Sequence, residues 1–315
     1  MPYYLGIDGG GTKTICGVGD DTRILATAAA GPSNIVRVGE VQARESLHQS
    51  VRQACAAAGI MPAQIAHTCV GAAGAARLEF AEMVRHALSE ILPTSIDVVG
   101  DMQIALEAAF NTGPGVIVNA GTGSFAYGRD RQGNTARAGG WGFAISDEGS
   151  AHWIGRAAVR AVLRAADRAD VETRGPFEHS PLVAALMKTW GVASLPDLAR
   201  AANSIPSPDF AKLFPAVTAS RDELALQVLN RAGRELADLG AVVINRLFPP
   251  GETGVVPVAM TGGVFRHAER VRDVFYNELR RIDGRVEVCP RLAEPVEGAL
   301  RMARWKAGAA QSAKG

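Results

Sequence analysis

Two stretches of this chain carry the same predicted order of strands and helices, and this repeated order most constrains the fold. In the first stretch three short apolar segments are separated by turn residues and are predicted as strands: Tyr3–Asp8, Thr14–Gly19 and Ile24–Ala29. Helical and extended patterns then alternate up to Phe110, which gives the order βββαβαβα. Strands that alternate with helices are typical of a mainly parallel sheet with helices on its faces, so an α/β fold is expected.

Hydrophobic periodicity defines the other elements of the first stretch. Leu47, Val51, Ala54 and Ala58 recur at helical spacing, and Gly59 is expected to end that helix. The elements that follow are a strand at Thr68–Gly71, a helix at 78–91, a strand at Ile96–Gly100 and a helix at Met102–Phe110.

The second stretch begins after Thr112-Gly113-Pro114-Gly115, which is the best candidate for a domain boundary. It again starts with strands and continues with a helix-rich region from about Glu148 to Leu247. Its predicted strands include Gly115–Asn119, Val256–Met260 and Val286–Cys289, and its last helix is Glu294–Lys306. The two stretches repeat each other in topology and not residue by residue. Two such units side by side are expected to leave a cleft that can hold a ligand.

Charge and hydrophobic content exclude several classes of protein. The 315 residues carry 33 Lys and Arg against 32 Asp and Glu, which gives a formal net charge of +1. Proteins that bind nucleic acid or anionic membranes use clustered positive charge, so neither partner is expected. The hydrophobic content of 47% is enough for large cores and argues against disorder. A chain of this length is expected to form two domains.

Cysteine usage and hydropathy indicate the compartment. The four cysteines, Cys16, Cys55, Cys69 and Cys289, have none of the spacings of a zinc site or a disulfide framework. A reducing cytoplasm is therefore the expected compartment. The start of the sequence lacks a basic segment followed by an apolar one, so we expect no signal peptide. No run of about 18 apolar residues occurs, so no membrane span is expected.

Glycine is over-represented and is concentrated in four segments. The chain has 35 glycines, about 11% of its residues, against a usual ~7%. Three of these segments directly follow a predicted strand, namely 8–14, 119–124 and 261–265, and the fourth is 139–150. Single glycines serve where the backbone turns sharply or comes close to a ligand, so these segments are candidate binding loops.

The first segment, 8–14 (DGGGTKT), has the chemistry of a phosphate-binding turn. Its glycines let backbone N–H groups point at an anion without interference from a Cβ atom. Thr12, Lys13 and Thr14 add hydroxyl and ammonium donors, and Asp8 could hold Mg²⁺ through water. Taken alone, the same residues also fit an ordinary glycine-rich hairpin.

The second segment, 119–124 (NAGTGS), has the equivalent place in the second stretch, and the third, 261–265 (TGGVF), follows another apolar strand. Each is weak alone, but glycines at strand ends in two similar halves are hard to attribute to ordinary turns. The chain has no GxxxxGK[ST] phosphate loop. Its one GxGxxA match, from Gly121 to Ala126, leads into a strand rather than a helix, so a dinucleotide-binding site is not expected.

The fourth segment, 139–150 (GGWGFAISDEGS), ends at the start of a predicted helix. An acidic pair is favourable at a helix N-terminus because of the helix dipole, so a capping role and a binding role both stay open. Asp101 also has two interpretations, since Asp is a good N-cap. As a carboxylate at the carboxyl end of a sheet strand, it could instead accept the proton of an attacking hydroxyl group.

Taken together, these segments resemble those of the sugar-kinase, heat-shock-protein-70 and actin superfamily. The resemblance is strongest to the BadF/BadG/BcrA/BcrD family, in particular its N-acetylglucosamine kinase branch, and covers about residues 3–305. DGGGTKT (8–14) and GTGS (121–124) look like the two phosphate loops, and TGGVF (261–265) looks like the adenosine loop. GGWG followed by DEGS (139–150) is the most branch-specific segment, and GPSN (31–34) resembles the segment that contacts the sugar.

The resemblance implies roles for individual residues. Asp101 corresponds to the catalytic aspartate and would be the general base, and Asp8 would hold Mg²⁺ through water. The residues implied for the sugar are Asn34, Gly121, Thr122, Gly140, Trp141 and Asp147. The residues implied for ATP are Gly10, Gly11, Thr12, Lys13, Thr14, Thr122, Gly123, Gly262 and Gly263. One departure is that Ser146 stands before Asp147, where the family segment usually has glycine.

The resemblance also implies a fold and an activity. The expected fold is two ribonuclease-H-like (actin-like ATPase) domains of βββαβαβα topology with an interdomain cleft. The N-terminal domain would be residues 1–113, completed by the C-terminal helix at about 294–306, and the C-terminal domain would be 114–293 with a helical insertion. The implied reaction transfers the γ-phosphate of ATP, with Mg²⁺, to the 6-hydroxyl of N-acetylglucosamine. A cytoplasmic homodimer is the family expectation.

Other substrates and functions stay open at this point. Within the kinases, glucosamine and N-acetylmuramic acid are the alternative substrates. The same family includes ATPase activators of acyl-CoA reductases and dehydratases, which hold an iron–sulfur cluster on mid-chain cysteines; here no cysteine lies between Cys69 and Cys289. A non-enzymatic sugar sensor would be expected to start with a helix-turn-helix, and this sequence opens on a strand.

Overall fold

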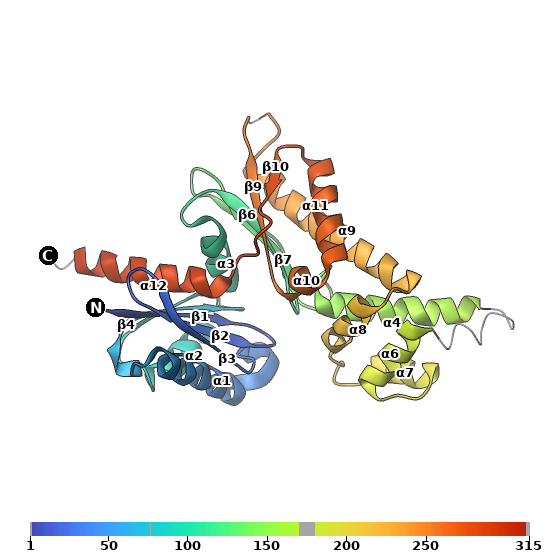
Figure 1. The fold of residues 1–315 in the computed structure, drawn as a ribbon, viewed down its shortest axis with the longest axis horizontal. Coiled ribbons are helices and arrows are strands. Elements are labelled where there is room, and N and C mark those ends of the chain that lie inside the picture. The colour runs from blue at the N-terminus through green and yellow to red at the C-terminus, as the bar shows by residue number, and fades with distance from the viewer. Residues whose placement is uncertain (1, 76, 170–179, 252, 313–315) are drawn as a thin grey trace. The chain divides into compact units, whose positions relative to one another are not determined.

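The computed structural model describes residues 2–75, 77–169, 180–251 and 253–312, and these form two compact units (Figure 1). The first unit is Met1–Pro114 together with Ala293–Gly315, and the second unit is Gly115–Leu292. Each unit contains a five-stranded sheet. Residues 170–179, which fall in the predicted helix-rich region, lie outside the described part of the chain.

The sheet of the first unit has the strand order β3-β2-β1-β4-β5. Its strands are β1 (Tyr3–Gly9), β2 (Thr14–Gly19), β3 (Ile24–Ala30), β4 (Ile65–Ala72) and β5 (Ser95–Gly100). The first three form an antiparallel meander, and β4 and β5 run parallel to β1. The register pairs Gly9 with Ala72 and Ala72 with Gly100, so the three parallel strands end side by side.

Helices cover both faces of this sheet because successive side chains of a strand point to opposite faces. The helices are α1 (Ile35–Ala58), α2 (Leu78–Ser89), α3 (Asp101–Phe110) and α12 (Pro295–Ser312), with a short 3-10 turn η1 (Pro62–Gln64). Leu5 on β1 packs in one core cluster with Leu47 of α1 and Leu88 of α2. Tyr4, its neighbour, packs in another cluster with Ile104 of α3 and Leu300 of α12.

Several boundaries differ from those predicted. Gly59 ends α1 in the left-handed conformation, with φ 70°, as predicted. However, β4 starts at Ile65 and not at Thr68. His67 is polar and therefore looks like the end of an apolar run, but it is buried within the strand. The last helix runs to Ser312 and not to Lys306. The alanine-rich sequence after Lys306 has a high helix propensity, which explains the extension.

Two glycines allow the backbone of α12 to pack directly against the backbones of α3 and β1. A Cβ atom added to Gly298 would lie 1.9 Å from the carbonyl oxygen of Ile104 in α3. One added to Gly6 on β1 would lie 2.3 Å from the backbone nitrogen of Leu300 in α12. Both distances are far below van der Waals contact, so part of the glycine excess serves core packing rather than binding loops.

The sheet of the second unit repeats this order as β10-β9-β6-β7-β8. Its strands are β6 (Gly115–Ala120), β7 (Ser124–Arg129), β8 (Thr135–Gly139), β9 (Val256–Thr261) and β10 (Val286–Val288). The first three again form an antiparallel meander, β9 runs parallel to β6, and β10 runs parallel to β9. The predicted repeat of topology is therefore confirmed, although the two halves share no evident sequence repeat.

The helical part of the second unit packs around one long helix. Its helices are α4 (Ala151–Arg168), α6 (Pro181–Trp190), α7 (Leu195–Ala202), η2 (Phe210–Leu213), α8 (Phe214–Ala219), α9 (Glu223–Leu247), α10 (Gly263–His267) and α11 (Glu269–Ile282). The helix α9 packs on the meander strands, and α11 packs beside α9. The helical spacing of Leu229, Ala232, Leu236, Leu239 and Val243 predicts one apolar face of α9; all of these are buried except Leu239, which is half-buried.

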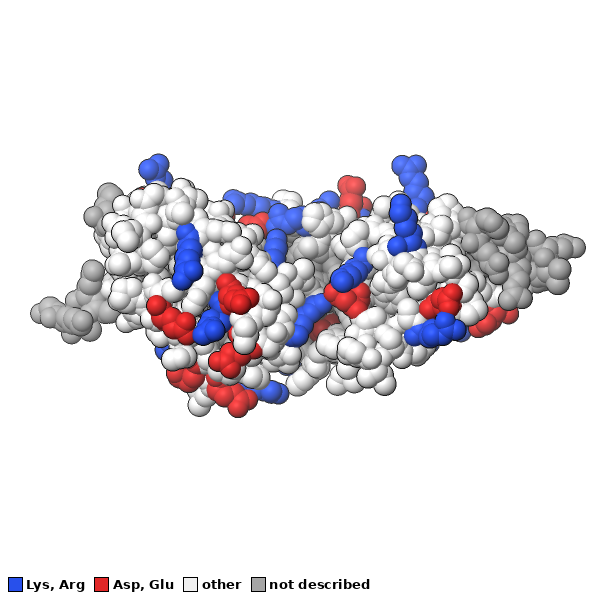
Figure 2. All heavy atoms as spheres, turned by 90° about the horizontal axis from the view of Figure 1, so that it is seen from below, with Lys and Arg blue, Asp and Glu red and all other residues white. Residues whose placement is uncertain are grey.

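Charge on the surface agrees with the balanced composition. Lys and Arg side chains are interspersed with Asp and Glu over the face shown in Figure 2. Among the described residues, no helix has both the length and the apolar character that a bilayer span requires.

We expect Gly298→Ala to destabilise the protein by about 2–4 kcal/mol, because the added methyl group collides with the backbone of α3. Gly308→Ala is the matched control. An added Cβ at Gly308 meets nothing within 4 Å, so this change is expected to be neutral or to stabilise α12 by up to about 1 kcal/mol. Urea unfolding midpoints measure both. A Gly298→Ala variant as stable as the parent would contradict the close approach of α12 to α3.

Candidate active site

The first glycine loop, residues 8–14, connects β1 to β2 and is held by backbone hydrogen bonds. The Gly10 N–H donates to the Lys13 carbonyl oxygen at 3.1 Å, which closes the turn. The Gly10 carbonyl oxygen accepts from the N–H groups of Ser33 at 3.2 Å and Asn34 at 3.3 Å. The loop predicted to bind phosphate and the segment predicted to contact the sugar are therefore tied together within the first unit.

Thr14 lies inside this unit rather than on the open side of the loop. Its side chain is buried, and its hydroxyl donates to the Gly31 carbonyl oxygen at 2.8 Å. The same hydroxyl lies 2.7 Å from that of Ser33. Thr14 thus holds the loop to the segment that begins at Gly31. Thr12 and Lys13 are exposed, and they are the side chains of the loop that can reach a ligand.

Asn34 stands at the start of α1 and acts as its N-cap. Its side-chain oxygen accepts from the Val36 N–H at 3.1 Å. The carboxamide nitrogen is not part of this cap, and it brings two N–H donors of the kind that bind sugar hydroxyl groups. Gly39, with φ 77°, interrupts the helical conformation four residues into α1. Asn34 therefore sits on a single turn that is set apart from the rest of the helix.

Asp8 and Asp101 follow two of the parallel strands at the same edge of the sheet. Asp8 lies at the end of β1, and Asp101 is the first residue of α3, directly after β5. Gly100 is the N-cap of α3, and its N–H donates to the side-chain oxygen of Gln103 at 3.0 Å. Asp101 accepts from the neighbouring Met102 N–H at 3.0 Å. The interpretation of Asp101 as an N-cap is therefore wrong.

The pKa of Asp8 is raised to about 7. Burial of its carboxyl group is the main cause, the negative charge of Asp101 is the second, and Glu294 adds a smaller effect, whereas Lys13 acts in the opposite direction. Two carboxylates whose negative charges act on each other in a partly buried place favour a nearby cation. Among the described residues no group of three or more His, Cys, Asp or Glu could hold a metal. The pair fits Mg²⁺, which needs few protein ligands because it keeps several waters.

In the second unit, the glycine turn 121–123 connects β6 to β7. The Gly121 N–H donates to the Gly123 carbonyl oxygen at 2.9 Å, and the Gly121 carbonyl oxygen accepts from the Ala151 N–H at 2.9 Å. A Cβ atom at Gly123 would lie 2.8 Å from a carboxylate oxygen of Asp147. The turn therefore packs against the segment that precedes α4, and Thr122 at its tip is only partly buried.

Asp147 joins two of the predicted binding loops. It is buried and adopts the left-handed conformation with φ 63°, which is uncommon for a residue other than glycine. Burial raises its pKa, and hydrogen bonds from the backbone of Ser124 and Gly142 oppose this shift. The N-cap of α4 is Ser150, whose hydroxyl oxygen accepts from the Trp153 N–H at 3.1 Å. The capping role of this segment therefore belongs to Ser150, and Asp147 links the 121–124 and 139–142 loops.

The GGWG turn presents an aromatic side chain. Gly139 and Gly140 both have φ 70°, a conformation that strains most other residues. Trp141, which follows them, is 72% exposed, and the Arg137 guanidinium carbon lies 4.6 Å from the centre of its ring. Such stacking fixes the ring. An exposed, held indole is a surface on which an apolar face of a sugar can pack.

Gly262 and Gly263 separate β9 from α10. Gly262 has φ 102°, and a Cβ atom there would lie 2.4 Å from the carbonyl oxygen of Ala120 and 2.9 Å from the side-chain oxygen of Asn119. Only glycine fits this position. Around Gly263 an added Cβ would meet nothing within 4 Å, so this backbone is open to an approaching group.

Two side chains at these loops are not among the residues predicted from the sequence. The Asn119 carboxamide lies beside Gly121 and Gly262 and so contacts both glycine turns of the second unit. The Arg37 side chain lies against Gly11, where a Cβ would be 3.6 Å from one guanidinium nitrogen. A polar residue near the end of an apolar strand is a signal that could have identified Asn119. Arg37 follows Asn34 by three residues, which places both on one helical face.

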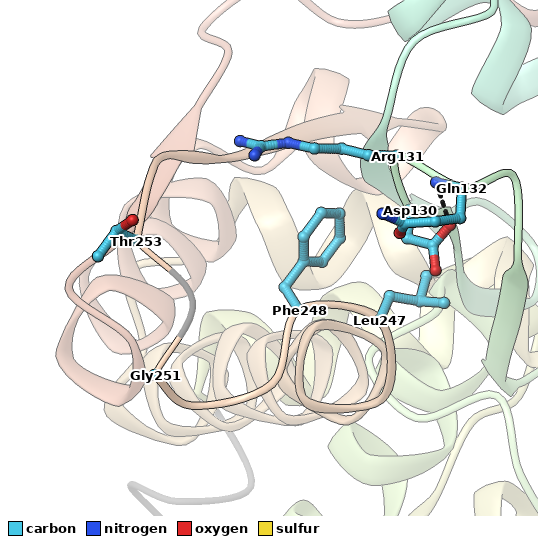
Figure 3. A pocket seen from close by; sticks show the side chains of 7 residues that line it. All are labelled: Asp130, Arg131, Gln132, Leu247, Phe248, Gly251 and Thr253. Carbon is cyan, nitrogen blue, oxygen red and sulfur yellow. Dashed lines mark hydrogen bonds between the residues drawn. The ribbon is translucent and has the colours of Figure 1, made fainter.

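A cavity of about 340 Å³ in the second unit lies away from these loops (Figure 3). It is lined by Asp130, Arg131, Gln132, Leu247, Phe248, Gly251 and Thr253. β7 runs antiparallel to β6, and its last residue, Arg129, pairs with Gly115, the first residue of β6. The cavity beyond Arg129 is therefore at the opposite end of the sheet from the 121–123 turn. It does not belong to the candidate site.

The fold and the glycine loops together define the class of protein to which this chain belongs. Two sheets of identical strand order, each with glycine turns after its parallel strands, are the architecture of actin-like ATPases with two ribonuclease-H-like domains. A solved structure, the putative N-acetylglucosamine kinase of Chromobacterium violaceum, matches 96% of this chain and 99% of its own with a TM-score of 0.73 and 26% identity. Residues 5–303 match the BadF/BadG/BcrA/BcrD ATPase family, and the chain belongs to this family.

Curated relatives of this chain are sugar kinases. The N-acetylmuramic acid/N-acetylglucosamine kinase of Clostridium acetobutylicum is 30% identical over 311 residues, which cover 96% of this chain and 99% of the relative. The N-acetyl-D-glucosamine kinase of Dictyostelium discoideum is 27% identical over 317 residues, with 95% and 97% covered. Full-length similarity to such enzymes, together with the family match, places this chain among the phosphotransferases with an alcohol group as acceptor.

The raised pKa of Asp8 predicts a stability effect whose sign depends on pH. Because the folded protein holds the Asp8 proton up to about pH 7, ionisation of Asp8 destabilises the fold increasingly from about pH 4 to pH 7 and fully above it. We therefore expect Asp8→Asn to stabilise the protein at pH 8, by up to about 4 kcal/mol, and to have little effect at pH 4. Thermal melts at the two pH values, without divalent cations, measure the difference. A lower midpoint for the variant at pH 8 would contradict the raised pKa of Asp8.

Proposed function

We propose that this protein is an ATP-dependent amino-sugar kinase that phosphorylates the 6-hydroxyl of N-acetylglucosamine. The observation that carries the proposal is the pair of carboxylates, Asp8 and Asp101, which follow two strands at the edge where three parallel strands end and whose charges act on each other. The 8–14 glycine turn lies at the same edge. Groups that can bind a cation, bind a phosphate and accept a proton therefore lie together at one edge of one sheet. The names of the curated relatives support an amino sugar as the acceptor.

In the proposed reaction Asp101 acts as the general base. The sugar hydroxyl oxygen attacks the γ-phosphorus of ATP in line, the bond from that phosphorus to the leaving ADP oxygen breaks, and Asp101 takes the hydroxyl proton. Asp8 would hold Mg²⁺ through water, and the cation would supply charge neutralisation at the phosphate oxygens. The first position of α3 suits this role because the Asp101 side chain is not needed to cap the helix.

Nucleotide contacts are proposed from loops in both units. In the first unit the backbone of Gly10 and Gly11 and the exposed Thr12 and Lys13 meet phosphate oxygens. Thr14 acts indirectly, because its buried hydroxyl holds the loop in place. In the second unit the corresponding groups are those of Thr122, Gly123, Gly262 and Gly263. The open space around Gly263 supports an approach of adenosine to the backbone there.

Sugar contacts are proposed for polar and aromatic groups near the phosphate turns. The Asn34 carboxamide donates to a sugar hydroxyl or to the N-acetyl oxygen, and Asp147 accepts from sugar hydroxyl groups while it holds two loops together. The backbone at Gly121, Thr122 and Gly140 lines the sugar, and Trp141 covers it with an aromatic surface. These residues recognise hydroxyl and amide groups, which N-acetylglucosamine offers.

We further propose that the two compact units act as the N-terminal and C-terminal actin-like ATPase domains. The protein is proposed to work in the cytoplasm as a homodimer. Support for the compartment comes from its cysteines, which are all free in the structure, as is typical of reducing conditions. Size-exclusion chromatography with light scattering tests the dimer.

Asp101→Asn is expected to lower kcat by about 10²–10⁴-fold, because an amide cannot accept the hydroxyl proton. The KM values and the circular dichroism spectrum should change little, since the two side chains have the same shape. Glu79→Gln, which removes an exposed carboxylate from the first turn of α2, is the control and should retain full activity. Near-normal turnover by a folded Asp101→Asn protein would rule out the general-base role.

A substrate panel separates the proposed acceptor from its alternatives. Phosphotransfer is measured with N-acetylglucosamine, glucosamine, N-acetylmuramic acid and glucose, and ³¹P–¹H correlation spectra locate the phosphate on the product. We expect the highest kcat/KM for N-acetylglucosamine, with the phosphate on the 6-oxygen. A preference for glucosamine or N-acetylmuramic acid would select an alternative substrate, and no transfer to any amino sugar would contradict the proposed class.

A further inference from the structure

We propose that the Arg37 guanidinium binds the γ-phosphate of Mg-ATP and is a further catalytic residue of the first unit. This inference rests on the proposed function for the identity of the nucleotide. It starts from the position of the Arg37 side chain, which lies against Gly11 in the middle of the 8–14 turn. A Cβ atom at Gly11 would be 3.6 Å from a guanidinium nitrogen and 3.7 Å from Cδ of Arg37.

Arg37 is held at this place by the backbone of its own segment. Its N–H donates to the Asn34 carbonyl oxygen at 2.9 Å, so it lies on the turn that Asn34 caps. That turn is tied to the glycine loop, because the Gly10 carbonyl oxygen accepts from Ser33 and Asn34. The left-handed Gly39 ends the turn immediately afterwards. The backbone at Arg37 is therefore linked to the glycine loop by hydrogen bonds among residues 10, 33, 34 and 37.

Two positively charged side chains, Lys13 and Arg37, lie at or beside the 8–14 turn. Lys13 is exposed, and its positive charge lowers the pKa of Asp8. The Arg37 side chain lies against Gly11, in the space that a side chain at position 11 would take, so its guanidinium stands directly beside the backbone of the turn proposed to bind phosphate. A guanidinium group presents a planar fork of N–H donors that matches two phosphate oxygens at once. The arrangement therefore suits Arg37 to the terminal phosphoryl group.

Binding of nucleotides, measured without any sugar, tests this role. Calorimetry with Mg²⁺ and either the β,γ-imido analogue of ATP or ADP compares a ligand that has a γ-phosphate with one that lacks it. We expect Arg37→Gln to weaken binding of the ATP analogue by about 10–100-fold, the usual effect of losing a hydrogen bond between charged groups, and to leave ADP binding unchanged. Arg37→Lys, which keeps the charge but not the fork, should give an intermediate loss.

Arg44→Gln is the matched control. Arg44 lies on the same helix and forms an exposed ion pair with Glu90 at 3.5 Å, away from the glycine loop, so this variant should bind both nucleotides like the parent protein. An equal loss of ATP analogue and ADP in Arg37→Gln, or no loss of either, would overturn the assignment to the γ-phosphate.

A second experiment distinguishes binding of the ATP phosphate by Arg37 from binding of an acidic sugar. If Arg37 recognised the carboxylate of N-acetylmuramic acid, Arg37→Gln would raise KM for that sugar alone and leave KM for Mg-ATP unchanged, which would also overturn the proposal. The expected result is a raised KM for Mg-ATP with every acceptor. Because the calorimetry needs no acceptor, failure of the substrate panel with an intact γ-phosphate effect would contradict the proposed function and leave Arg37 in its role.

Discussion

The parallel pairing of β1, β4 and β5 is the constraint on which the candidate site of the first unit depends. Because these strands end at one edge, Asp8 and Asp101 lie close enough for the charge of one to raise the pKa of the other. The fold keeps both carboxylates there although their repulsion and the burial of Asp8 lower its stability. A cost of this kind is common at functional sites, and a bound cation would offset it.

In each unit, hydrogen bonds link two of the proposed binding segments to each other. In the first unit the Gly10 carbonyl oxygen joins the glycine loop to the turn that carries Asn34. In the second unit the Asp147 carboxylate joins the 121–124 turn to Gly142. Each linkage connects a segment proposed for phosphate with one proposed for sugar. A ligand that orders one member of such a pair also restricts the other, which is one physical route to ordered binding of two substrates.

Much of the fold could be predicted because local pattern controls it. Short apolar runs between turn residues and helical hydrophobic spacing predicted the order of elements in both units, and Gly59 ends α1 as expected for a left-handed residue. Helix capping could not be assigned in the same way. In the sequence, Asp101 and the acidic pair at 147–148 fitted a capping role as well as a binding role. In the structure, Gly100 is the N-cap of α3 and Ser150 is the N-cap of α4. Side chains that suit a cap also suit a ligand, and only the backbone path decides between them.

By itself the sequence determined the α/β class, the repeated topology and the four glycine-rich segments, because these depend on residues close together in the chain. The tertiary structure decided which side chains of those segments are exposed and able to contact a ligand. It buries the Thr14 hydroxyl, raises the pKa of Asp8 through Asp101, and sets Arg37 against Gly11. It also shows that Gly6 and Gly298 serve the packing of α12. Burial and the proximity of charges depend on contacts between segments far apart in the chain, so they could not be predicted from a local sequence pattern.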